Sequence, residues 1–173
     1  MALALQLTLL SVFPAMVVVG ALRDLTSFTI PNWISAVLVF AFFPAALAGG
    51  LKLDELGLHL LVGVAALAAG MGMFALRWIG GGDAKLFAAS ALWLGWPAFL
   101  SYGFQTAVAG GALAVALLSL RSPVLRPYVL TGPAWFNRLA DPDEAVPYGV
   151  AIAAGALLAF PASPLAQVVL AHL

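Results

Sequence analysis

Two acidic residues stand where an apolar segment meets a polar one, and both have unusual neighbours. Asp24 follows a run of residues, 1–22, that carries no charge. Asp83 follows three consecutive glycines, Gly80, Gly81 and Gly82. Such a run of glycines costs conformational entropy and lets a backbone or a ligand come close to the neighbouring carboxylate. These two acids are therefore the first candidates for chemistry.

Two carboxyl groups that share a partly dehydrated site cannot both ionise, so the pair holds one proton. That arrangement suits peptide hydrolysis without a metal or a cofactor. The ionised acid takes a proton from water, which attacks the scissile carbonyl, while the protonated acid hydrogen-bonds the oxyanion and helps to protonate the leaving nitrogen. The structural alternatives are a boundary ion pair between Arg23 and Asp24 and a solvated glycine hinge that ends at Asp83.

The other five acids have solvent-facing explanations, in one turn and in one proline-containing loop. They are Asp54 and Glu55 in the turn, and Asp141, Asp143 and Glu144 in the loop. A calcium site in that loop is an alternative, but its ligands are few and lack the spacing of a calcium-binding loop. The chain has no cysteine and two histidines far apart in the sequence, which argues against a zinc site.

The composition places these acids in a membrane protein. Apolar residues make up 64% of the 173 residues and charged residues 8%, against roughly 25% charged in soluble domains. A water-soluble globule is excluded, and we expect one all-α transmembrane domain over residues 1–173 with the lipid bilayer as its surroundings. Seven basic residues balance seven acidic ones, so no basic field attracts nucleic acid.

Five charge-free runs mark the membrane segments: residues 1–22, 25–51, 56–76, 86–120 and 145–173. We divide the fourth run into two helices that meet near Ser101, Tyr102 and Gly103, because six spans place six basic residues on one side and only Lys52 opposite. The six are Arg23, Arg77, Lys85, Arg121, Arg126 and Arg138. If residues 86–120 formed one span, three basic residues would lie on one side of the membrane and four on the other. The six-helix topology puts the N-terminus outside the cytoplasm and both candidate aspartates on the cytoplasmic side.

Three further features lie near the candidate aspartates or on the same predicted side of the membrane. Pro31 suits the opening turn of the second helix. Lys85 is a positive anchor that reaches the headgroups, or it stabilises one aspartate as the anion and so fixes which acid is the base. Residues 121–145 mix prolines, aromatic residues and three arginines, which is typical of a segment lying on the cytoplasmic headgroups.

These residues resemble two active-site motifs of type IV prepilin peptidases. The first is Asp24 with Ile30, Pro31 and Asn32, and the second is the G-x-G-D signature, which ends here at Asp83. Residues 146–152 also resemble the start of the last helix in the short members that serve Flp/Tad-type pili. The resemblance implies a bacterial inner-membrane aspartic endopeptidase that removes prepilin leaders on the cytoplasmic side, with Asp24 and Asp83 as the catalytic pair. It implies supporting roles for a further set: Gly80, Gly81, Gly82, Lys85, Pro31 and Asn32.

The implied partners are prepilins or pseudopilins with a basic leader and an apolar helix, together with the pilus assembly machinery. Long members of the family carry a cytoplasmic domain with paired C-x-x-C motifs and methylate the new N-terminus. Here that connection is about nine residues without cysteine, so we expect no N-methyltransferase activity and no S-adenosylmethionine site.

Three alternatives remain. Presenilin-like proteases share G-x-G-D, but their first aspartate follows a tyrosine where this chain has Arg23. A proton-coupled transporter would place its ionisable groups near the midplane and on broken helices. A non-catalytic pilus or secretion assembly subunit would leave the three glycines and the two aspartates unexplained.

Overall fold

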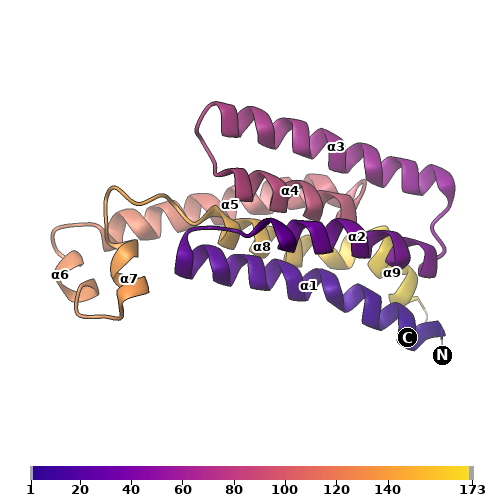
Figure 1. The fold of residues 1–173 in the computed structure, drawn as a ribbon, viewed down its shortest axis with the longest axis horizontal. Coiled ribbons are helices and arrows are strands. Elements are labelled where there is room, and N and C mark those ends of the chain that lie inside the picture. Colours follow the sequence, from indigo (N-terminus) through magenta and orange to yellow (C-terminus); the bar gives the residue numbers. More distant parts are fainter. Residues whose placement is uncertain (1, 172–173) are drawn as a thin grey trace.

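The computed structural model describes residues 2–171, and this part of the chain is helical with no strand (Figure 1). Five helices form the bundle up to residue 120, two short helices follow, and two more close the chain. In order they are α1 (Ala2–Ser27), α2 (Asn32–Ala48), α3 (Leu53–Ala75), α4 (Gly81–Leu94), α5 (Ala98–Leu120), α6 (Arg126–Val129), α7 (Ala134–Leu139), α8 (Tyr148–Ala159), a 3-10 turn (Phe160–Ala162) and α9 (Pro164–Leu170).

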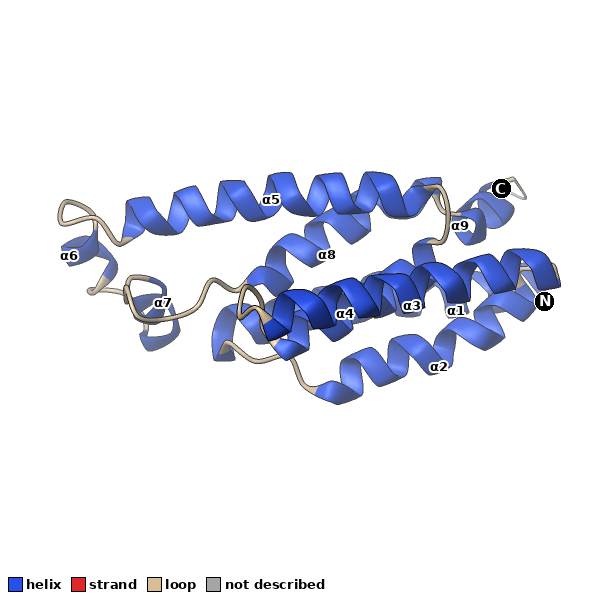
Figure 2. Cartoon of the chain, turned by 90° about the horizontal axis from the view of Figure 1, so that it is seen from above, coloured by secondary structure: helices blue, strands red, loops and turns tan. Residues whose placement is uncertain are grey.

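One end of the bundle contains the C-termini of helices α1, α3 and α5 and the N-termini of helices α2, α4 and α8 (Figures 1 and 2). We call it the arginine end, because it contains the connections 28–31, 76–80 and 121–147. Six of the seven basic residues lie in these connections or on the helix turns near them, and Lys52 lies in the connection 49–52 at the opposite end. The end-to-end alternation therefore separates basic residues as the six-span topology expects.

Three described helices are long and apolar enough to cross a membrane, namely α1, α3 and α5. A fourth crossing results if α8 and α9, which are bent by 50°, form one span. The two remaining bundle helices are shorter, with 17 residues in α2 and 14 in α4, against the about 20 that a straight span needs. The chain is an all-helical membrane protein, and the six-span topology stays a prediction.

The predicted position of one helix break was wrong. We expected the run 86–120 to divide near Ser101, Tyr102 and Gly103, but these residues lie inside α5. The division falls at residues 95–97. Gly95 adopts a φ of +60°, which favours glycine, and Pro97 caps the start of α5. Gly95 leaves the helical conformation and Pro97 has no N–H to continue it. The break therefore lies earlier in the chain than hydropathy indicates.

Helix α4 occupies the centre of the bundle and packs against α2, α3 and α8. Glycines allow α3 to approach it closely: an ideal Cβ at Gly63 would lie 3.1 Å from the Cβ of Leu92, and one at Gly70 would lie 3.1 Å from the Cβ of Ala84. On the α2 side, the buried Trp93 indole donates a hydrogen bond of 2.7 Å to the Leu38 carbonyl. The contact at Ala84 fixes the start of α4 beside Asp83, and the contacts at Leu92 and Trp93 fix its other end.

Residues 121–145 fold back along the arginine end through α6 and α7. Arg121 donates hydrogen bonds to the carbonyls of Leu139 (3.0 Å) and Glu144 (2.9 Å). Arg138 pairs with the Glu144 carboxylate at 2.6 Å, which is the one ion pair within residues 2–171, and its guanidinium lies 4.6 Å from the centre of the Phe28 ring. Glu144 is therefore engaged, and the described residues contain no group of three metal-ligating side chains in this loop or elsewhere. Contact of this segment with headgroups stays a prediction.

Candidate active site

Asp24 lies on the last two turns of α1, close to where that helix stops. The hydroxyls of Thr26 and Ser27 bond the carbonyls of Leu22 and Arg23 (2.7 and 2.6 Å), which competes with further helix formation. Pro31 then caps the start of α2, with an extended backbone. Asp24 is 5% exposed and makes no ion pair with Arg23 in the described structure, so the boundary-pair interpretation fails.

Asp83 lies in the first turn of α4, and the glycines before it belong to the same turn. Gly80 caps the helix, and its N–H donates a hydrogen bond of 3.0 Å to Oδ2 of Asp83. The other carboxylate oxygen, Oδ1, is buried and accepts no hydrogen bond from residues 2–171. A capping role explains one oxygen only, and an exposure of 7% contradicts a solvated hinge.

A third element, the start of α8, joins the two aspartates. The Gly149 N–H, one of the free donors in the first turn of α8, donates a hydrogen bond of 2.7 Å to Oδ2 of Asp24. Tyr148, the residue before Gly149, lines the same cavity as both aspartates. An ideal Cβ on Gly149 would lie 2.9 Å from both Cβ and Oδ2 of Asp24, so only glycine fits here without a shift.

The two carboxyl groups share one cavity of about 550 Å³ at the arginine end. Its lining comes from α1, α3, α4, α8 and the connections between them: Asp24, Phe28, Phe74, Arg77, Trp78, Ile79, Gly80, Asp83, Ala145, Val146 and Tyr148. Phe28 and Arg77 have left-handed backbones, with φ of 53° and 61°. Non-glycine residues in this region are strained and cluster at functional sites. The structure thus brings together two aspartates that lie far apart in the sequence.

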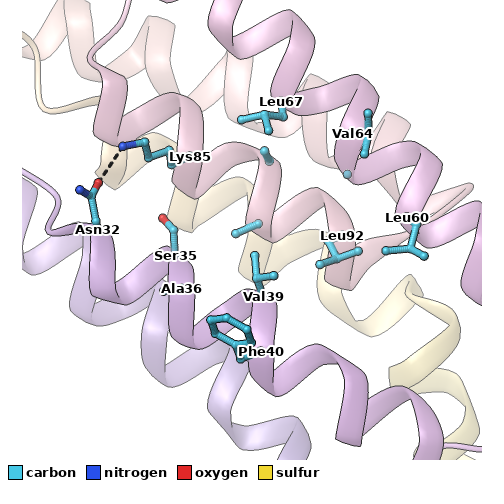
Figure 3. Close-up of a pocket in the computed structure, with 13 residues that line it drawn as sticks. Asn32, Ser35, Ala36, Val39, Phe40, Leu60, Val64, Leu67, Lys85 and Leu92 are labelled. Atoms are coloured by element: carbon cyan, nitrogen blue, oxygen red, sulfur yellow. Dashed lines mark hydrogen bonds between the residues drawn. The ribbon is translucent and has the colours of Figure 1, made fainter.

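Two of the predicted supporting residues, Lys85 and Asn32, lie outside the cavity that the aspartates share, which we call the aspartate cavity. Lys85 donates a hydrogen bond of 2.8 Å to Oδ1 of Asn32, and both residues line a separate cavity of about 490 Å³ (Figure 3). Figure 3 shows this pair at one end of an otherwise mostly apolar trough between α2, α3 and α4. Neither residue lines the aspartate cavity, so the geometry gives no direct contact by which Lys85 would select the base.

The glycines differ in what they contact. Gly81 faces the ring of Phe74, with an ideal Cβ 3.4 Å from it, while Gly82 packs against Ile30, 3.0 Å from its Cβ and 3.2 Å from its carbonyl. Close packing between α4 and the connection after α1 thus explains Gly82 without a ligand. Pro31 ends that connection.

Sequence reasoning did not assign Gly149, Tyr148, Phe28 or Arg77 to the site. Residues 146–152 were singled out as a resemblance, which is a signal for Gly149 and Tyr148, but spacing alone does not indicate that α8 returns to Asp24. Phe28 and Arg77 carry no sequence signal, since positive φ at these residue types follows from tertiary packing.

The fold and site define a class: an all-helical membrane protein in which two buried carboxyl groups from different helices face one cavity at the bundle end. The profile of the type IV leader peptidase family matches residues 11–115, which include both aspartates. The chain belongs to that family, and is accordingly a protease of the prepilin leader peptidase type. No match emerges among curated proteins or among solved structures.

Proposed function

We propose that the chain is an aspartic endopeptidase that removes the leader of type IV, Flp-type prepilins, with Asp24 and Asp83 as its catalytic pair. The observation that carries the proposal is the shared cavity. Two carboxyl groups, 5% and 7% exposed, face one space that is large enough for water and a peptide segment. Neither acid forms an ion pair within the described residues. Buried acids of this kind are costly in a membrane protein and are typical of functional sites.

The proposed reaction uses one proton shared by the pair. The ionised carboxylate takes a proton from water, and the water oxygen attacks the scissile carbonyl carbon. The protonated carboxyl hydrogen-bonds the developing oxyanion, and when the carbon–nitrogen bond breaks, the leaving nitrogen receives the proton. Gly149 and Gly80 fix one oxygen of each aspartate through their N–H groups, which leaves Oδ1 of Asp83 available for water or substrate.

The proposal places the site at the cytoplasmic face of a bacterial inner membrane, in a six-span topology. Support comes from the arginine end, which holds six basic residues against Lys52 at the other end, in line with the positive-inside tendency. The connection between α1 and α2 is residues 28–31, too short for a folded domain, and we propose leader cleavage without N-methylation by this chain. The pilus assembly machinery is its proposed setting.

The test is co-expression with a Flp-type prepilin, scored by the loss of the leader on a gel. We expect Asp24→Asn and Asp83→Asn each to abolish cleavage while membrane levels stay near wild type, because asparagine keeps the size but cannot cycle a proton. The double variant should be no less active than either single one, since the pair acts as a unit. Asp54→Asn and Asp141→Asn are controls that should cleave normally.

Retained cleavage in either variant, with expression confirmed by blot, would remove the aspartic mechanism. Absence of cleavage by the wild type with several prepilins would instead favour a non-catalytic assembly subunit.

A further inference from the structure

A second cavity, of about 390 Å³, lies along α5 and adjoins the aspartate cavity. Ile79 and Tyr148 line both, so these two residues form a wall that the cavities share. The wall on α5 is formed by small residues, Gly103, Ala107, Gly111 and Ala114 among them. We call this cavity the α5 groove. It lies beside the aspartate cavity and follows α5 from Gly103 to Ala114.

The small residues follow one face of α5. Their spacing of three or four places them one above another, and the distance from Gly103 to Ala114 corresponds to about 16 Å of helix. An ideal Cβ on Gly103 or on Gly111 would meet no atom of the described residues within 4 Å. The two glycines therefore leave room that the packing of this chain does not use.

Helix α5 is also the least covered of the long helices. Of its most apolar stretch 11% is buried within the protein, against 22% for α1 and for α3. It packs mainly on α8. Small residues in membranes let a second helix approach closely, so an open small-residue face beside a cavity fits a helical partner.

A helix in this groove would lead to the two carboxyl groups. In the adjoining aspartate cavity, Asp83 is 7% exposed and its Oδ1 has no hydrogen-bond partner within the described chain. We infer that the α5 groove holds the apolar helix of the substrate, so that the peptide bond at the end of that helix reaches the aspartates beyond Ile79 and Tyr148. This inference rests on the proposed peptidase function.

The cavity between α2, α3 and α4 is the competing location. It is apolar along Val39, Leu60 and Val64, but it shares no lining residue with the aspartate cavity (Figure 3). Its polar end is the Lys85–Asn32 pair and not a carboxylate. A helix bound there would have its end directed at Lys85, on a different face of α4 from the catalytic pair.

The absence of cysteine from the chain makes disulfide trapping specific. Gly111→Cys, in the Asp24→Asn background that keeps substrate uncleaved, is oxidised together with a prepilin that carries one cysteine in its apolar helix. We expect a disulfide-linked complex at Gly111 and none at Ala36→Cys, which probes the competing cavity, or at Gly57→Cys on an open face of α3. Crosslinking at Ala36 that equals or exceeds that at Gly111 overturns the inference.

A second experiment obstructs the groove. Gly111→Leu and Gly103→Leu meet no atom of the described structure at Cβ, and leucine is a better helix former than glycine, so α5 itself is not weakened. We expect at least about a tenfold loss of cleavage with normal membrane levels, which corresponds to about 1.4 kcal/mol of substrate interaction. Gly57→Leu is the matched control, with equally open space, and should cleave normally.

The two proposals fail in different ways. If wild type cleaves, Asp24→Asn does not, and both groove variants cleave at the wild-type rate, the peptidase stands and the groove assignment is wrong. If wild type does not cleave while the crosslink at Gly111 forms, the groove binds a helix and the proposed reaction is wrong.

Discussion

The contact between Gly149 and Asp24 gives the sharpest test of the site's geometry. In Gly149→Ala, the added methyl group would lie 2.9 Å from Cβ and Oδ2 of Asp24 and 2.9 Å from Cδ1 of Ile30. Ordinary contact begins at 3.4 Å, so α8 or Asp24 must move by at least the difference, 3.4 − 2.9 = about 0.5 Å. The hydrogen bond of 2.7 Å from the Gly149 N–H would lengthen beyond the range of a strong charge-assisted bond.

The expected cost has two parts. Overpacking of this kind destabilises by about 1–3 kcal/mol. Displacement of a catalytic group by about 1 Å can cost about 10²-fold in rate, so the shift at Asp24 should lower cleavage by about 10-fold to 10²-fold. The assay is the initial rate of leader removal by purified protein in liposomes, measured beside the thermal unfolding midpoint.

Two controls separate crowding at the site from crowding in general. Gly57→Ala adds a methyl group in open space and should change neither rate nor stability. Gly63→Ala crowds α3 against α4, 3.1 Å from the Cβ of Leu92 and away from the aspartates, so stability should fall more than the rate. A Gly149→Ala protein that cleaves at the wild-type rate would refute the role given to this contact.

Two further substitutions test the neighbourhood of the pair. Gly82→Val should lower both cleavage and the thermal midpoint, because a Cβ at this position would lie 3.0 Å from the Cβ and 3.2 Å from the carbonyl oxygen of Ile30. A variant with wild-type stability would contradict the packing explanation. Lys85→Gln should cleave at near the wild-type rate, because Lys85 bonds Asn32 in a separate cavity, and a large loss would show that its charge acts on the aspartates.

Both aspartates could be singled out from the sequence as candidates because their signals are local. Long apolar runs indicate the helices, the division of basic residues predicts their direction in the membrane, and an acid at the end of a run is conspicuous on its own. The helix break at Gly95 and Pro97 was missed because hydropathy is continuous across residues 86–120, although glycine and proline are the residues that end helices.

What the sequence could not give is the set of contacts between distant segments. The hydrogen bond from Gly149 to Asp24 joins residues 125 apart, and no periodicity indicates such a pairing. The same holds for Lys85, whose proximity to Asp83 in sequence suggested an electrostatic role. On a helix, residues two apart point in different directions, so Lys85 faces α2 and Asn32 while Asp83 faces the cavity.

The short length of α4 bears on how water reaches Asp83. Its 14 residues rise about 21 Å, which is less than the about 30 Å of a hydrocarbon core. Trp96 is 47% exposed just after α4. Because tryptophan is typical of membrane interfaces, we expect that end of the helix to lie at one membrane surface. In that placement we expect Asp83, at the other end, to lie several ångströms below the opposite surface, so that water reaches it through the aspartate cavity.

This depth predicts a labelling pattern in single-cysteine variants. Val146→Cys, on the wall of the aspartate cavity, should react with a water-soluble, membrane-impermeant maleimide in inverted vesicles and not in spheroplasts, because the proposed topology opens this cavity to the cytoplasmic side. Val64→Cys, 64% exposed on α3 and lining the trough of Figure 3, should stay unlabelled in both, since lipid covers it. Labelling of Val146→Cys in spheroplasts would show that the bundle has the opposite orientation to the one proposed. Protection in both preparations would mean that water does not enter the cavity, and hydrolysis by the aspartate pair would then lack its nucleophile.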